Sequence, residues 1–148
     1  MKAANKGFVI KTGTIEQAFE LYLKIPEFKN PYKIEVLQKR FIAKHLILVA
    51  YHKDAPVAFK IGYALNEDVF YSWLGGVLPK YRNLKIASQL IIEQENWAKL
   101  QHFSSIEVKT RNCFKGMLKL LIAHDYLIKS VEPKSSTIEN RIIFSKKL

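Results

Sequence analysis

The sequence has only one cysteine, Cys113, among its 148 residues. A lone cysteine excludes a framework of internal disulfides and is typical of proteins in the reducing cytosol. No apolar run approaches the roughly 20 residues that a membrane-spanning helix needs. The first six residues lack the apolar stretch of a secretory signal. These absences predict a cytoplasmic protein with no membrane partner.

Acidic residues are also scarce. The sequence has 13 Asp and Glu and 24 Lys and Arg, which gives a formal net charge of +11. Such an excess attracts nucleic acids, anionic membranes and phosphorylated cofactors, but a lysine-rich solvated surface produces it equally well. The basic residues are scattered, and no run of five or more occurs. No helix-turn-helix or aromatic-interleaved basic segment is present either. We therefore expect no nucleic-acid partner and keep a basic nucleic-acid-binding module only as a minor alternative.

Metal-ligand and nucleotide-hydrolysis patterns are missing as well. The histidines have no ligand spacing with one another or with Cys113; they are His45, His52, His102 and His124. No Gly-x-x-x-x-Gly-Lys loop occurs. We predict no metal site.

What the chain does contain is a regular alternation of strand-like and helix-like segments. Thr14 and Gln17 form a capping-box pattern before a first helix that Pro26 ends, and Asn30-Pro31 is expected to open a second helix with Ile42 on its apolar face. Further helices are predicted over 84–100 and 117–123. Strands are predicted over 8–11, 46–51, 57–63, 69–77, 105–109, 126–131 and 138–144. The order β-α-α-β-β-β-α-β-α-β-β, without repeat or linker, predicts one α/β domain over residues 1–148, a mixed sheet with helices on both faces.

The segment from Trp73 to Ala87 carries the clearest chemistry. It runs from the end of a strand through Gly75-Gly76 and a short turn into a helix. Adjacent glycines at a strand end allow a bulge or a close approach to the backbone. The N–H groups at a helix N-terminus form an anion site, and Arg82 adds a guanidinium that matches phosphate. Together these features predict a pyrophosphate cradle beside a strand edge.

The run Gly76-Val77-Leu78-Pro79-Lys80-Tyr81-Arg82, continued by Lys85-Ile86-Ala87, resembles the acetyl-CoA signature of GNAT N-acetyltransferases. The order of elements is similar to that fold over essentially the whole chain, and the segment 110–118 resembles the start of the family's fourth helix. The resemblance implies that the fourth and fifth strands splay apart and hold the pantetheine of acetyl-CoA. The residues it implies for cofactor binding are Val77, Leu78, Arg82, Asn83, Leu84, Lys85, Ile86, Ala87, Asn112 and Lys115, with the backbone near Val77 also polarising the thioester.

Two positions depart from the family pattern. Lys85 stands where the loop usually has glycine, either as a cation beside the phosphates or as a solvent-facing side chain. Leu121 stands where many members have a tyrosine that protonates the leaving thiolate. A thiol with a pKa of about 8.5 leaves tolerably as thiolate, so this departure bears on mechanism more than on fold.

The acceptor side offers three candidates. Tyr71 lies six residues before Val77, where some members place a glutamate base. By strand alternation it shares a face with Trp73 and Gly75, so we expect Tyr71 and Trp73 in the acceptor pocket, with packing under a helix as the alternative for Tyr71. Glu27 lies in the connection between the first two helices, where it either holds an ammonium group or is merely exposed.

The resemblance therefore predicts direct transfer of an acetyl group from acetyl-CoA to a primary amine. The alternative is a degenerate member of this fold that binds acyl-CoA as a sensor. The acceptor is not identified by the sequence. A homodimer is compatible with it, but the oligomeric state is not determined.

Overall fold

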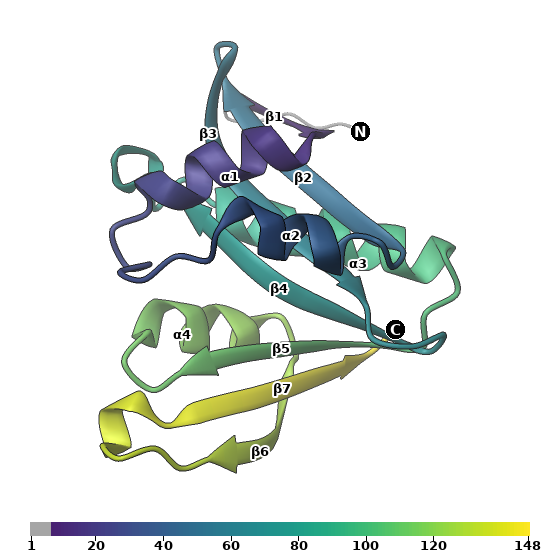
Figure 1. The fold of residues 1–148 in the computed structure, drawn as a ribbon, viewed down its shortest axis with the longest axis vertical. Helices are drawn as coiled ribbons and strands as arrows, with labels where there is room; N and C mark the ends of the chain where they lie inside the picture. The colour runs from purple at the N-terminus through teal and green to yellow at the C-terminus, as the bar shows by residue number, and fades with distance from the viewer. Residues whose placement is uncertain (1–6) are drawn as a thin grey trace.

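The computed structural model describes residues 7–148 and shows the predicted order of strands and helices (Figure 1). The N-terminal residues used above in the argument against a secretory signal lie outside the described range. The elements are β1 (Phe8–Thr12), α1 (Ile15–Lys24), α2 (Ile34–Arg40), β2 (His45–His52), β3 (Ala55–Ala64), β4 (Val69–Val77), α3 (Ile86–Leu100), β5 (Ser105–Arg111), α4 (Lys115–Ala123), β6 (Leu127–Glu132) and β7 (Arg141–Lys147). Short 3-10 turns, η1 (Pro79–Tyr81) and η2 (Thr137–Glu139), precede α3 and β7.

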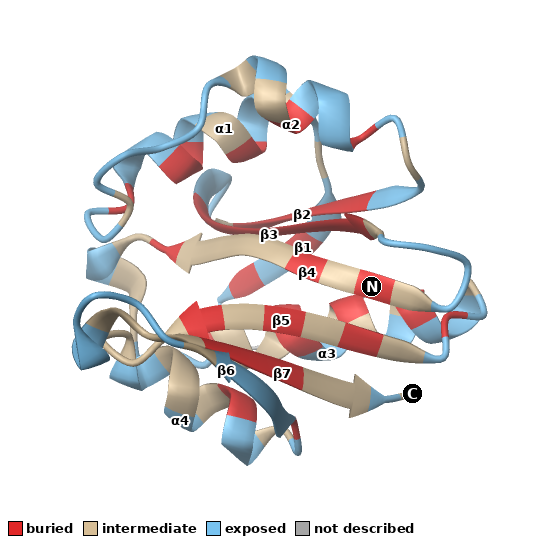
Figure 2. Ribbon diagram, turned by 60° about the horizontal axis from the view of Figure 1, so that its bottom comes forward, coloured by how far each residue is buried: buried red, intermediate tan, exposed pale blue. Residues whose placement is uncertain are grey.

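The seven strands form one mixed sheet in the order β1-β2-β3-β4-β5-β7-β6. Neighbours are antiparallel except β4 and β5, which run parallel because α3 crosses between them. Helices α1 and α2 cover one face of the sheet, and α3 and α4 cover the other (Figure 2). The mixed α/β prediction with helices on both faces is confirmed.

Each face of the sheet has its own hydrophobic core. Phe59, Ile61 and Tyr63 of β3 pack under α1 and α2, whereas Ala58 of the same strand belongs to the core under α3 and α4. In β2 the segment 46–50 is buried throughout, as its nearly continuous apolar sequence predicts for a strand covered on both faces.

Helix α1 starts where its local sequence predicts. The Thr14 hydroxyl accepts from the Gln17 N–H at 3.2 Å, and the Gln17 side chain accepts from the Thr14 N–H at 2.9 Å. This capping box satisfies two donors of the first turn. The helix ends before Pro26, whose ring cannot continue it.

The prediction for the start of the second helix was wrong. Residues 30–33 form a connection without helix or strand, and α2 begins only at Ile34, with Lys33 as its N-cap. The connection is held by a tertiary bond, in which the Tyr32 N–H donates to the Tyr22 hydroxyl at 2.8 Å. Ile42 lies beyond the helix and is 86% exposed, so it is no part of the apolar face.

Three other boundaries shift. Helix α3 begins two residues later than predicted, after Lys85, and α4 begins two residues earlier, at Lys115. The start of the last predicted strand forms the turn η2 instead, so β7 begins at Arg141. Within residues 7–148, no helix combines the length and the hydropathy that crossing a bilayer requires.

Candidate active site

The parallel strands β4 and β5 pair over only part of their length. Their ladder runs from Val69 opposite Ser105 to Ser72 opposite Val108. Beyond it, β4 continues along β3 to Val77, while β5 continues along β7 to Arg111. The two strands therefore separate at the carboxyl end of the ladder, as Figure 1 shows, and the backbone edges of β4 and β5 face one another across a gap.

A β-bulge in β4 lies where the strands separate. Ile61 of β3 pairs with Leu74 and Gly62 pairs with Ser72, which leaves Trp73 as the extra residue. Tyr71 and Trp73 pack with the core under α1 and α2. Gly75 instead faces Lys60, on the side of α3. The expectation that Gly75 shares a face with Tyr71 was wrong, because the bulge shifts the alternation of the strand by one residue.

The backbone of Val77 is turned toward the gap. The next residue, Leu78, donates its N–H to the Val57 carbonyl of β3 at 2.9 Å. Alternate residues of an antiparallel strand direct their backbone groups to opposite sides, so those of Val77 point away from β3. Consistently, the Val77 carbonyl accepts a bond from Arg82 Nε at 2.9 Å. The Val77 N–H is thus directed toward the space between β4 and β5.

The turn into α3 leaves a row of backbone N–H groups for a ligand. The first α-helical bond of α3 runs from the Gln89 N–H to the Lys85 carbonyl, so the amides before Gln89 have no acceptor in the helix. Leu84 and Lys85 are exposed and Ile86 is buried. Asn83 and Lys85 adopt left-handed φ values of 64° and 67°. The position where glycine was expected thus has the conformation that glycine favours, and for lysine this costs about 1–2 kcal/mol.

Arg82 and Glu27 form a two-pronged ion pair. Arg82 Nη1 and Nη2 each donate to a Glu27 carboxylate oxygen at 2.9 Å. These hydrogen bonds from Arg82 lower the pKa of Glu27. Together with its bond to Val77, the guanidinium joins the α1–α2 connection to the end of β4. Arg82 was predicted to bind the cofactor and Glu27 to bind the acceptor. In the structure the two side chains bind each other.

A cavity of about 260 Å³ lies over the point where β4 and β5 separate. It contains both predicted acceptor-side residues, Tyr71 and Trp73, whereas Glu27 is not part of its lining. The other lining residues are Tyr32, Arg40, Tyr63, Leu65, Lys109 and Arg141. Sequence reasoning missed these because they come from separate elements and share no motif. The one available signal was the alternation along β5. It places the side chain of Lys109 on the face of the sheet opposite to that of the buried Val108 and Thr110.

Aromatic rings and cations are stacked along the cavity wall. The ring of Tyr63 meets those of Tyr71 and Trp73 edge-on, at centroid distances of 5.6 and 5.5 Å. Arg40 Nη1 donates to the Tyr63 hydroxyl at 2.6 Å. Burial, with the nearby Tyr63, raises the pKa of Tyr71 to about 12. Tyr71 is therefore a neutral phenol at physiological pH, able to donate a proton in a hydrogen bond.

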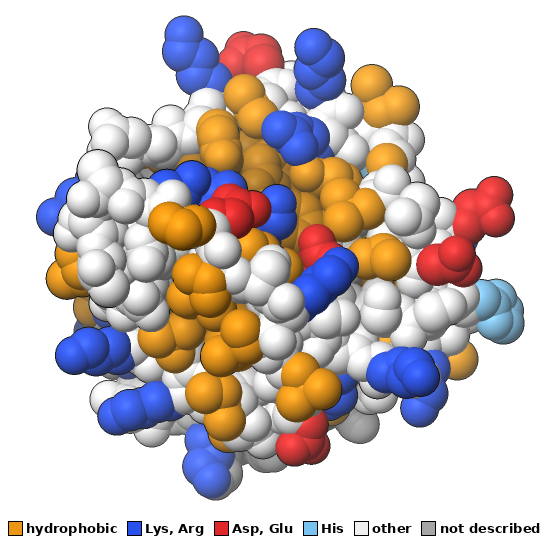
Figure 3. Space-filling model, turned by 90° about the horizontal axis from the view of Figure 1, so that it is seen from below, with side chains coloured by type: hydrophobic (Ala, Val, Ile, Leu, Met, Phe, Trp, Pro, Cys, Tyr) orange, Lys and Arg blue, Asp and Glu red, His pale blue; other side chains and the backbone are white. Residues whose placement is uncertain are grey.

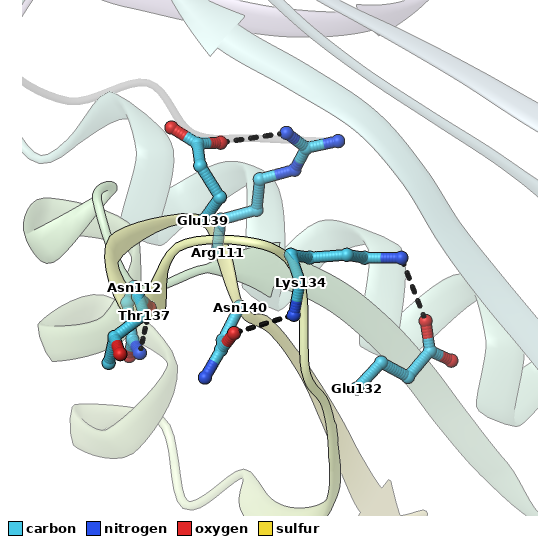
Figure 4. A network of polar contacts seen from close by, with 7 residues as sticks. All are labelled: Arg111, Asn112, Glu132, Lys134, Thr137, Glu139 and Asn140. Carbon is cyan, nitrogen blue, oxygen red and sulfur yellow. Dashed lines mark hydrogen bonds and ion pairs between the residues drawn. The ribbon is translucent and has the colours of Figure 1, made fainter.

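The far side of the gap is built from the end of β5 and the β6–β7 connection (Figure 4). The Asn112 side-chain amide donates to the Thr137 carbonyl at 3.0 Å, and Arg111 pairs with Glu139 at 2.9 Å. Lys115 is exposed as the first residue of α4. Leu121 is 1% exposed within the core, so this helix position supplies packing and no hydroxyl. Among residues 7–148, no three His, Cys, Asp or Glu side chains are grouped to hold a metal ion.

Comparison with solved structures shows the same fold at low sequence identity. Ard1 from Thermoplasma volcanium superposes with a TM-score of 0.83 at 13% identity, covering 96% of this chain and 98% of that one. A GNAT family acetyltransferase from Elizabethkingia anophelis, solved with acetyl-CoA bound, gives 0.78 at 16% identity, with 97% and 100% coverage. The ribosomal-protein-S18-alanine N-acetyltransferase from Escherichia coli gives 0.81 at 12% identity, with 95% and 93% coverage.

Sequence comparison leads to the same family. None of the curated proteins matches this sequence. The model of the acetyltransferase (GNAT) family matches residues 15–121, from the start of α1 to α4. This match spans more than half of the chain and includes the β4–α3 signature and the gap between β4 and β5. The chain therefore belongs to the GNAT acetyltransferase family.

Proposed function

We propose that this protein transfers an acetyl group from acetyl-CoA to a primary amine in a ternary complex. The observation that carries the proposal is the geometry of the gap between β4 and β5. At one end the gap opens on the free amides before α3, and at the other it closes beneath the cavity lined by Tyr71 and Trp73. A thioester in this gap would have its pyrophosphate at the first end and its acetyl group at the second.

The cofactor contacts follow from this placement. The amides of residues 83–87 and the Lys85 side chain bind the pyrophosphate, with the positive end of the α3 dipole behind them. The Arg82 N–H is not among these amides, because it donates to the Pro79 carbonyl at 3.3 Å. The pantetheine lies along β4 as an added strand beside Val77, whose N–H faces the gap. Leu78 was also expected to bind the cofactor, but both of its backbone groups are already bonded, to the Val57 carbonyl and the Tyr81 N–H. Asn112 and Lys115 border it from the β5 side. In this arrangement the Arg82 guanidinium contacts the phosphates while it stays paired with the Glu27 carboxylate.

The reaction needs few groups from the protein. The acceptor amine loses a proton to water, and its nitrogen forms a bond to the thioester carbonyl carbon. The Val77 amide stabilises the resulting oxyanion, a contribution of about 3 kcal/mol for such a donor. The carbon–sulfur bond then breaks and CoA leaves as thiolate, which suits the absence of a hydroxyl at Leu121. Positioning of the two substrates supplies much of the remaining rate increase.

Acetyl-CoA is expected to stabilise the folded protein. Ligand at about 100 times its Kd contributes about 2.7 kcal/mol by linkage, which thermal unfolding detects as a shift in Tm. An assay of CoA release with a panel of amines distinguishes an enzyme from a sensor that binds acyl-CoA without turnover. No thermal shift at millimolar acetyl-CoA contradicts the proposal.

Nucleic-acid binding is the weaker alternative. On the face seen in Figure 3, Lys and Arg side chains are scattered over both the rim and the centre, and apolar, acidic and neutral groups separate them. Phosphate-backbone binding instead uses a continuous basic stripe. A thermal shift caused by short nucleic acids but not by acetyl-CoA would favour this alternative.

Arg82→Ala is expected to weaken acetyl-CoA binding about tenfold to a hundredfold, because a charge-assisted phosphate contact contributes about 1.5–3 kcal/mol. Isothermal titration measures the change. Glu27→Ala is the matched control, since it removes the same ion pair but leaves the guanidinium free for phosphate. If both variants lose affinity equally, Arg82 acts by holding the α1–α2 connection and not by contacting the cofactor.

Tyr71→Phe is expected to lower turnover about tenfold to a hundredfold while acetyl-CoA affinity stays unchanged. The substitution keeps the ring and removes the one polar atom, the neutral hydroxyl that orients the amine or a proton-carrying water. Steady-state kinetics on a verified acceptor, with titration of acetyl-CoA as control, measure both quantities. Unchanged turnover would make Tyr71 a packing residue.

We further propose a cytoplasmic homodimer. The lone cysteine supports the location, and the edge strand β6 supports the assembly, because Leu127, Ile128 and Val131 are 73%, 59% and 49% exposed along it. Unpaired edge strands with apolar side chains are sites of association. Light scattering of the purified protein measures the mass in solution.

A further inference from the structure

The cavity over the separation of β4 and β5 contains charge of only one sign. Arg40, Lys109 and Arg141 line it, and no lining residue is acidic. The carboxylate of Glu132 lies 3.7 Å from Arg141 and partly offsets its charge. Within residues 7–148, Arg40 and Lys109 form no ion pair. The lining therefore carries a net positive charge, which Glu132 offsets only in part.

The aromatic faces of the cavity are already occupied by cations of the protein. The Arg40 guanidinium lies 5.7 Å from the centroid of the Tyr63 ring and 5.5 Å from that of Trp73. The ammonium group of Lys109 lies 5.6 Å from the centroid of Tyr71. Aromatic faces are the places where a cavity without carboxylates would bind a cationic ligand. Their occupation disfavours polycationic acceptors.

We infer that the acceptor is a small amine that also carries an anionic group, a carboxylate or a phosphate, held by Lys109 and Arg141. This inference rests on the proposed acetyl transfer and specifies the substrate class of that site. Charge-assisted bonds to a carboxylate or phosphate are the interactions for which these two side chains are suited. A volume of about 260 Å³ fits a molecule of amino-acid size, because cavities for drug-sized ligands start at about 300 Å³.

The same charges account for the missing carboxylate base. An ammonium group placed among like charges has a lowered pKa, so a bound acceptor loses its proton to water more readily. Lys109 and Arg141 hold the anionic group, while Arg40, the third cation of the lining, favours the free amine that attacks the thioester. Water accepts the proton, and the positive charge of the cavity makes its loss easier at a site where Tyr71 stands in place of a carboxylate base.

The inference can be tested without turnover, by measuring the binding of N-acetylated amines that resemble the product. Each pair consists of an anionic compound and its uncharged counterpart. Equilibrium dialysis with CoA present compares N-acetylphenylalanine with its uncharged amide, and N-acetylphosphoethanolamine with N-acetylethanolamine. The anionic member of at least one pair is expected to bind at least about tenfold more tightly, as a charge-assisted contact predicts. The two pairs distinguish carboxylate from phosphate recognition. Equal binding within both pairs would overturn the inference.

Substitutions in the cavity test whether its cations cause the preference for the anionic compound. Lys109→Gln and Arg141→Gln are each expected to reduce the preference for the anionic member about tenfold, while Lys119→Gln, an exposed residue of α4 on the opposite face of the sheet, leaves it unchanged. A preference that survives both cavity substitutions contradicts the assigned site.

Turnover separates this inference from the proposed function. With free amines, the kcat/KM for phenylalanine is expected to exceed that for phenylalaninamide, or that for phosphoethanolamine to exceed that for ethanolamine. Spermidine is expected to be the poorest acceptor. If acetyl-CoA shifts the Tm and spermidine is the best acceptor, acetyl transfer stands and the anionic acceptor is refuted. If acetyl-CoA neither binds nor is turned over, the proposed function itself fails.

Discussion

Gly62→Ala is expected to destabilise the protein by about 3 kcal/mol, the upper range for forcing extra volume into a packed core. A Cβ atom at position 62 would lie 2.4 Å from the Tyr71 carbonyl oxygen and 2.6 Å from the Phe70 ring. Phe70 is fully buried, and the Tyr71 backbone belongs to the adjacent strand, so neither yields easily. Relief requires β3 and β4 to move apart at the bulge, beneath the cavity. Chemical denaturation measures the change in the free energy of unfolding.

Gly116→Ala is the matched control for this prediction. Apart from its own residue, its chain neighbours and the nearby backbone of α4, no atom lies within 4 Å of the Cβ position at Gly116, in the first turn of α4. Alanine is favoured over glycine in a helix by about 0.8–1.0 kcal/mol, so this variant is expected to be slightly more stable than the parent. If Gly62→Ala unfolds at the same denaturant concentration as the parent, the bulge is not tightly packed against β3.

Lys60→Met is expected to stabilise the protein at neutral pH by about 3 kcal/mol. Lys60 lies on β3 facing α3 and is only 7% exposed. Burial lowers its pKa from 10.5 to about 8, against the opposing attraction of Glu95. A shift of this size corresponds to about 1.4 kcal/mol per pKa unit of unfavourable interaction with the charged form. Glu95 keeps a partner in the variant, because Lys146 Nζ lies 3.0 Å from its Oε1.

The stabilisation is expected to depend on pH in a defined direction. Between pH 8 and 10.5 the unfolded chain binds a proton at Lys60 that the folded protein does not, so stability of the parent rises with pH across this window. The advantage of Lys60→Met is therefore full below pH 8 and shrinks toward pH 10.5. Denaturation curves at several pH values measure it, with Lys119→Met, an exposed lysine of α4, as control. An equal effect of both variants, or an advantage that grows with pH, would refute the buried charge.

Elements whose signals are local could be predicted from the sequence. The start of α1 depends on Thr14 and Gln17, three residues apart, and the capping box forms as expected. The β4–α3 segment likewise carries its own strand end, turn and helix start within residues 73–87. Capping and turn formation involve neighbours in the chain, so the local sequence is enough to specify them. The start of α2 was mispredicted: the residues before Ile34 stay outside the helix, and there Tyr32 bonds Tyr22, a contact between residues ten positions apart that no local pattern encodes.

Features of the site that join distant segments could not be predicted. The bulge at Trp73 depends on the pairing of β4 with β3, and it reverses the face on which Gly75 lies. The pair between Arg82 and Glu27 joins residues 55 positions apart. The rings and cations of the cavity come from α2, β3, β4, β5, β7 and the α1–α2 connection.

The sequence by itself determined the order of elements and the family, on the resemblance of the segment between β4 and α3 to the family's signature. Only the tertiary structure decided which side chains line the cavity over the separation of β4 and β5 and what charge they carry. The physical reason is that helix caps, turns and hydrophobic periodicity are short-range properties of the chain. The register of strands and the packing of loops over them are set by contacts between residues far apart in sequence, where a single bulge changes which side chains meet.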